Sequence, residues 1–146
     1  ATIRYPGEQV YAELYFAEEA ATTGGAGGGA LGSVTVKDTE IASVSGKNLI
    51  VVGGSCVNTV AASLLGSDVP MCGGAWEDAT GVGSGSFLIQ TFANPFTTGK
   101  IATLVAGYNA GDTTNAATYL RTQTPTTNVG DKYVGTSSTS ASLVVA

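Results

Sequence analysis

Residues 47–66, KNLIVVGGSCVNTVAASLLG, combine an apolar run, a glycine pair and the start of an expected helix. Leu49–Val52 are four consecutive large aliphatic residues, a pattern typical of a strand that is buried on both faces. After the glycine pair, apolar residues recur at helical spacing from Val57 onward, and Gly66 marks the expected end of the helix. The stretch therefore predicts a strand–turn–helix unit, the opening half of an α/β layer.

The rest of the chain supplies further strands and one more helix. Apolar and polar residues alternate or aliphatic residues cluster in four more segments, which we expect to be strands: 8–17, 33–37, 87–93 and 101–106. Asp112 is the expected N-cap of a helix that carries Ala116 and Leu120 on one side, and Pro125 lies beyond its end. We predict an α+β or α/β fold, β-rich overall, with a mixed sheet of about four to six strands and two helices.

The domain organisation follows from the same pattern. The length suits a single domain over residues 1–146. We expect N-terminal strands with a glycine-rich loop in 1–37, a βα core in 38–124 and a tail strand in 125–146. The sequence of strand, glycine turn and alanine-rich helix occurs at 49–65 and again at 103–120. This indicates either an internal repeat or two ordinary βα units.

Three segments carry a resemblance. They are NLIVVGGSCVNTVAASLLG at 48–66, GSGSFLIQTFANPFTTGKIATLVAGYNAGDTTNAATYL at 83–120 and, more weakly, RYPGEQVYAELYF at 4–16. In this order they resemble the C-terminal domain of archaeal surface-layer (S-layer) proteins. The resemblance implies an extracellular, self-assembling structural protein. Members of that family are usually far longer, so we expect either a processed piece or a reduced relative that polymerises by itself, as a filament or as a planar lattice.

Composition excludes several classes of protein. Only 12% of the 146 residues are charged and 21 are glycine, which is too apolar for a disordered chain and a poor surface for a freely soluble monomer. The net charge of −5 and the scattered basic residues argue against nucleic-acid binding. No apolar run approaches the roughly 20 residues of a membrane-spanning helix.

The two cysteines, Cys56 and Cys72, are too few for a zinc site, and the chain has no histidine. In an exported chain we expect them to form a disulfide, with two buried free thiols as the alternative. The bond would join the first turn of the expected helix to the loop at 71–73.

No catalytic or cofactor-binding motif is present. Gly53 and Gly54 are not followed by the glycines of a dinucleotide fingerprint, so we interpret them as packing residues at a βα turn that bind no phosphate. No histidine could activate Ser55 or Cys56, and we interpret the neighbouring acids as solvated charges: Glu77 with Asp78, and Asp38 with Glu40. We expect no enzyme and no cofactor.

Oxygen ligands for calcium could come from four acids: Glu77, Asp78, Asp112 and Asp131. None of them lies in a dedicated calcium-binding loop, so we assign no metal residues.

The residues that point to function are those suited to contacts between copies. Aromatic side chains are enriched in subunit interfaces, and a short uncharged β-prone segment can join the edge of a sheet. The expected assembly contacts are Tyr5, Tyr11, Tyr15, Leu143, Val144 and Val145. Trp76, Tyr108 and Tyr133 are either core residues or further contacts. We therefore expect a homopolymer at the cell surface. The alternative is a module that anchors to a surface glycan through an aromatic, carboxylate-lined groove.

Overall fold

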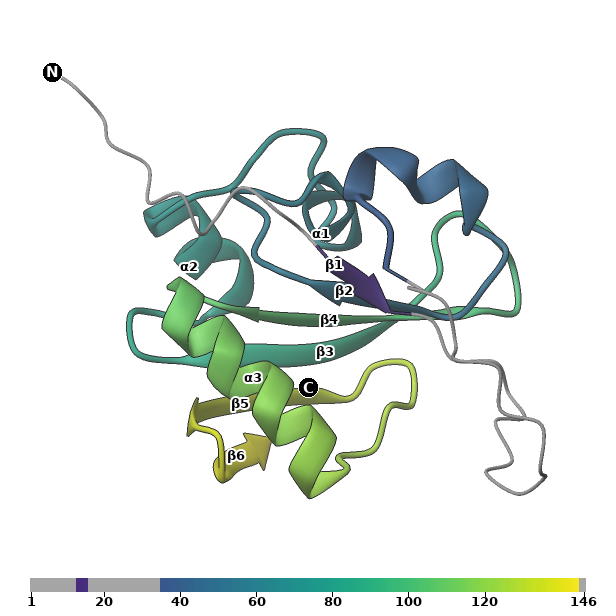
Figure 1. Cartoon of the computed structure of the whole chain (residues 1–146). Helices are drawn as coiled ribbons and strands as arrows, with labels where there is room; N and C mark the ends of the chain where they lie inside the picture. The colour runs from purple at the N-terminus through teal and green to yellow at the C-terminus, as the bar shows by residue number, and fades with distance from the viewer. Residues whose placement is uncertain (1–12, 16–34, 145–146) are drawn as a thin grey trace, which may run out of the picture.

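The computed structural model describes residues 13–15 and 35–144 (Figure 1). The described residues form one six-stranded sheet. β2 and β4 are parallel, and every other neighbouring pair of strands is antiparallel. The predicted mixed sheet is therefore confirmed. Its strands, in order across the sheet, are β1 (Glu13–Tyr15), β2 (Leu49–Val52), β4 (Ile101–Gly107), β3 (Phe87–Ala93), β5 (Lys132–Ser137) and β6 (Ser140–Leu143).

The two expected helices are α1 (Thr59–Leu64) and α3 (Ala110–Gln123). α1 ends as predicted, because Gly66 at φ 78° donates to Ser63 and the next amide donates to Ala62, which closes the helix with a left-handed glycine. The N-caps differ from the prediction. α1 begins after Asn58 and not at Val57, and the N-cap of α3 is Asn109, with Asp112 reaching back to its amide at 3.0 Å.

Two short helical segments fall where the sequence predicted only connections. They are the 3-10 helix η2 (Asp38–Ser43) and α2 (Gly74–Thr80). α2 has only seven residues and lies between Gly73 and Gly81. A helix of this length is too short for its apolar residues to show a helical period in the sequence. α2 forms because it buries Trp76, which no local pattern reveals. The expected strand at 33–37 is reduced, within the described part, to a single bridge residue, Val36. Of the expected strand at 8–17 the structure describes only β1.

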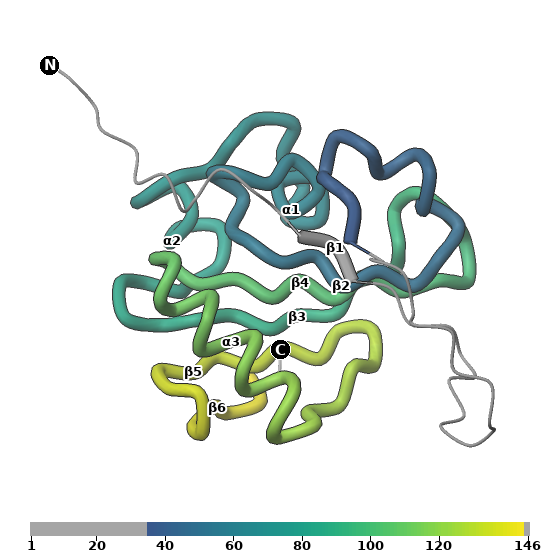
Figure 2. The backbone as a smooth tube through the Cα atoms, in the orientation of Figure 1, coloured from purple at the N-terminus to yellow at the C-terminus, as the bar shows by residue number. Residues whose placement is uncertain are grey.

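The helices cover both faces of the sheet. Figure 2 shows α3 crossing in front of β4, β3 and β5. On that face Phe87, Ile89 and Val105 are buried against Ala116 of α3. On the other face α1 and α2 pack onto a larger core that includes Val51, Leu104 and Trp76. Because β2 and β4 are parallel neighbours whose helices lie on opposite faces, both sides of the central strands are buried, as their aliphatic composition predicts.

Candidate assembly edges

β6 forms one edge of the sheet, and Figure 1 shows it at the opposite edge from β1. It is the second strand of a hairpin with β5, in which Tyr133 lies opposite Leu143 and Gly135 lies opposite Ala141. Gly135 makes this close approach possible, since a Cβ atom there would lie 2.7 Å from the Ala141 Cβ and 2.5 Å from the Ser140 carbonyl oxygen. The tail segment was predicted to contact another copy. In the structure residues 140–144 instead pair with β5 of their own chain and form the new edge of the sheet.

The hydrogen-bond register shows which backbone groups of β6 point outward. The Val144 amide donates to the Lys132 carbonyl at 2.7 Å, so Lys132 and Val144 form a hydrogen-bonded pair of the antiparallel ladder. In an antiparallel ladder such pairs recur at every second residue, so Ser142 also points its backbone toward β5. The N–H and C=O groups of Ala141 and Leu143 therefore point away from β5, to the outer side of the sheet.

β6 is a short edge strand beside an irregularity in the register of β5, but its sequence lacks two common forms of edge protection. Natural edge strands are commonly blocked by charged side chains, proline or a covering segment. Residues 140–144 contain neither a charged residue nor proline. Leu143 is 47% exposed and Val144 is 42% exposed, and among the described residues no strand pairs with the outer side of β6. The edge therefore combines outward backbone groups with exposed apolar side chains.

The register of β1 at the other edge follows from its neighbour. The Gly53 amide donates to the Val105 carbonyl of β4 at 3.0 Å. By alternation Val51 also points its backbone to β4, whereas Ile50 and Val52 point theirs to β1. The partners of Ile50 and Val52 are Tyr15 and Glu13, so these two residues hold β1 to β2. Leu14 lies between them, and its N–H and C=O point away from β2.

The predicted assembly residues are distributed unevenly. Leu143 and Val144 lie exposed at the edge formed by β6. Tyr15 lies in β1 at the other edge, with its side chain outside the described part of the structure. Tyr5, Tyr11 and Val145 lie outside the described residues. The outward positions Leu14 and Ala141 were missed, since only the strand register identifies them.

Of the three aromatic residues considered as core residues or as further contacts, Trp76 is buried, whereas Tyr108 and Tyr133 are partly buried. Trp76 is 3% exposed and belongs to the larger core. Tyr108 packs against that core, and Tyr133 packs against the core beneath α3. The Tyr133 hydroxyl also lies 2.8 Å from the Thr126 hydroxyl, which fixes the loop before β5.

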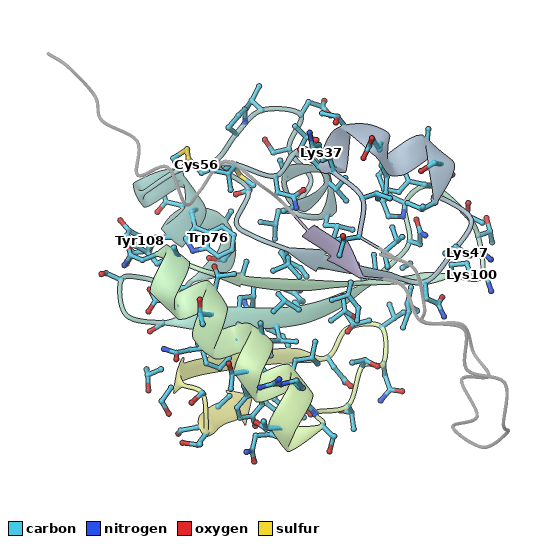
Figure 3. The ribbon with its side chains drawn as sticks, in the orientation of Figure 1. Lys37, Lys47, Cys56, Trp76, Lys100 and Tyr108 are labelled. Carbon is cyan, nitrogen blue, oxygen red and sulfur yellow. A yellow bond between two sulfur atoms is a disulfide. The ribbon has the colours of Figure 1, made fainter. Side chains whose placement is uncertain are left out.

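The predicted disulfide between Cys56 and Cys72 is confirmed (Figure 3). Cys56 lies in the turn before α1, not in the helix as expected. Beside the disulfide, Ser55 is fully buried, and its hydroxyl donates a hydrogen bond to the Met71 carbonyl at 2.9 Å. The disulfide and this hydrogen bond close the same loop, so they fix the loop to the start of α1.

Removing the Cys56–Cys72 disulfide is expected to destabilise the folded chain. Replacing both Cys56 and Cys72 by serine is expected to lower the free energy of unfolding by about 3 kcal/mol, because the unfolded chain regains the entropy of a loop of about 16 residues. Urea unfolding of the double variant, and of the native chain with and without reductant, measures this loss. Equal stability of the oxidised and reduced native chain would contradict a structural role for the bond.

The glycine pair lies in the turn after β2 as expected, but close packing does not require it, since a Cβ atom at Gly53 or Gly54 would meet its nearest neighbours at 3.9 and 3.6 Å. Gly53 adopts φ 109°, a conformation that favours glycine. The first amides of α1 already have acceptors within the chain: the Asn58 carboxamide oxygen accepts from Val60 and Ala61, and Asp38 accepts from the Thr59 amide at 2.8 Å. The N-terminus of this short helix is thus capped by Asn58 and by Asp38 of η2.

Two of the four acids considered for calcium, Asp112 and Asp131, have structural partners. Asp112 accepts from the amides of Asn109 and Gly85 and so ties α3 to the loop before β3. Asp131 closes the turn before β5, where hydrogen bonds from Thr126 and Asn128 lower the pKa of its carboxyl group below the ordinary value. Within residues 13–15 and 35–144 the structure contains no group of three or more metal-ligating side chains.

None of the helices in the described part is both long and apolar enough to cross a membrane. No protein-family model matches the chain, and no match was found among curated proteins or solved structures.

Proposed function

We propose that this chain is a structural, self-assembling protein of the cell surface, an S-layer-like subunit that forms a filament or a lattice. The observation that carries the proposal is the uncharged, proline-free edge at β6, where Ala141 and Leu143 direct backbone donors and acceptors outward beside exposed apolar side chains. An edge of this kind is a ready template for a strand of another chain.

Three further features support the proposal. The segments at 48–66 and 83–120 resemble those of S-layer proteins. The disulfide fits a protein that works in an oxidising compartment, such as the outside of the cell. Pairing through backbone groups requires few charged side chains, which suits a chain with 12% charged residues and a net charge of −5.

Self-assembly of the purified native chain tests this proposal. Sedimentation velocity over a range of concentrations, followed by negative-stain electron microscopy, is expected to show growth from monomers to extended polymers without added ligand. A chain that stays monomeric at high concentration contradicts the proposal. Retention of that monomer on immobilised surface glycan would identify an anchoring module instead.

A further inference from the structure

The two edge strands of the sheet run in the same direction. β1 is antiparallel to β2, and β2 is parallel to β4. From β4 the direction reverses at β3, at β5 and again at β6. Taking the direction of β2 as up, β1 and β6 both run down. Among residues 13–15 and 35–144 no strand pairs with the outer side of either edge strand, so the described sheet has two edges of the same polarity, one at Leu14 and one at Ala141 and Leu143.

This polarity limits how two copies can pair. If β6 meets β6 of a second copy about a two-fold axis, the strands are antiparallel and this contact by itself closes as a dimer. Further growth then needs a second kind of contact, β1 with β1. If β6 meets β1 of the next copy, the strands are parallel, and one repeated contact uses both edges of every internal subunit without closing. The second arrangement therefore pairs the outward groups of Leu14 and of Leu143 through a single kind of contact.

We propose that copies of this chain join head to tail, with β6 of one copy pairing in parallel with β1 of the next to form one continuous sheet. The inference rests on the proposed function and adds the partner strand and its direction. The second copy is the occupant that the observations favour, since its β1 offers outward backbone groups from Leu14 with the polarity that continues the sheet. The uncharged residues 140–144 also place no like charge against Glu13.

The arrangement implies a definite helical symmetry. Neighbouring strands are spaced about 4.8 Å apart, so six strands per subunit give an axial rise of about 29 Å. Each strand is rotated by about 20–25° relative to the last, so successive subunits are rotated by roughly 120–150° about the polymer axis. A closed β6–β6 dimer has no such rise.

Two proline variants separate the two edges. Leu143→Pro removes one of the two outward amides of β6 and places a proline ring on that edge, and Leu14→Pro removes the outward amide of β1. The amides that bind β5 and β2 remain, because both prolines replace outward-pointing residues. Each variant alone is expected to remain monomeric, since one of its edges is blocked. Mixed at equal concentration, they are expected to form a 1:1 heterodimer that grows no further. Leu143→Ala and Leu14→Ala, which keep the amides, serve as controls and are expected to polymerise.

Sedimentation velocity and native mass spectrometry distinguish the outcomes, and near-ultraviolet circular dichroism checks that each variant is folded. Self-dimers of Leu14→Pro would show two-fold β6–β6 pairing and overturn the inference. Polymerisation of Leu143→Pro, or a mixture that stays monomeric while the native chain polymerises, would also overturn it and leave self-assembly intact. A native chain that never assembles overturns the proposed function itself. If a proline variant does not fold, the axial rise of the native polymer decides, with about 29 Å expected and any other rise contradictory.

Discussion

Gly107→Ala is expected to lower the free energy of unfolding by about 3 kcal/mol, a large share of the stability of a domain of this size. A Cβ atom at this position would lie 2.3 Å from the Asp112 Cβ and 2.6 Å from the Thr113 amide nitrogen. These atoms belong to the first turn of α3, so relief requires the helix to move away from the end of β4. That movement would also lengthen the 2.9 Å hydrogen bond from the Gly107 amide to the Thr113 hydroxyl.

The matched control lies four residues away. Gly111 is inside α3, and a Cβ atom there would meet nothing within 4 Å. Gly111→Ala is therefore expected to stabilise the chain by about 0.5–1 kcal/mol through helix propensity. Urea unfolding of both variants measures the difference. Equal effects of the two substitutions would show that α3 does not pack against Gly107 as described.

Gly135→Ala is expected to cost about 2–4 kcal/mol and to weaken the hairpin that presents the β6 edge. A Cβ atom here would lie 2.4 Å from the Phe87 ring and 2.5 Å from the Ser140 carbonyl oxygen. Phe87 is fully buried and its ring packs near Tyr119, with centroids 5.8 Å apart, so it has little room to yield. The strain falls on β6, the outer and shorter strand of the pair.

Thr136→Ala is the control, since Thr136 is the exposed neighbour on the same strand. We expect it to change the free energy of unfolding by less than about 0.5 kcal/mol and to leave assembly unchanged. Thermal unfolding and sedimentation of the two variants provide the comparison. A Gly135→Ala chain that is as stable as the native chain would contradict the close approach of β6 to β5.

The central strands could be predicted from sequence because their signal is local. β3 has the predicted bounds, and the run at 101–106 is extended only by Gly107 in β4. Short elements could not be predicted, because α2 and η2 gain their stability from the core that they cover. The burial of Trp76, for example, depends on strands far away in the chain.

At the edge formed by β6, some features are likewise visible in the local sequence and others depend on distant pairings. The apolar and uncharged character of Leu143 and Val144 is visible in the sequence and predicts an edge. Which residues turn their backbone outward depends on register, and register depends on pairings such as Lys132 with Val144 that join distant positions. The shared direction of β1 and β6 depends on five such pairings across the sheet, so no single segment encodes it.

Cryo-electron microscopy of the assembled native chain would show directly how the subunits meet. We expect a polymer in which β6 of each subunit lies beside β1 of the next, in parallel, with the outward groups of Leu143 and Leu14 on the contact line and a rise of about 29 Å per subunit. A polymer whose subunits meet through α3 or the disulfide loop, with both sheet edges facing solvent, would contradict this expectation.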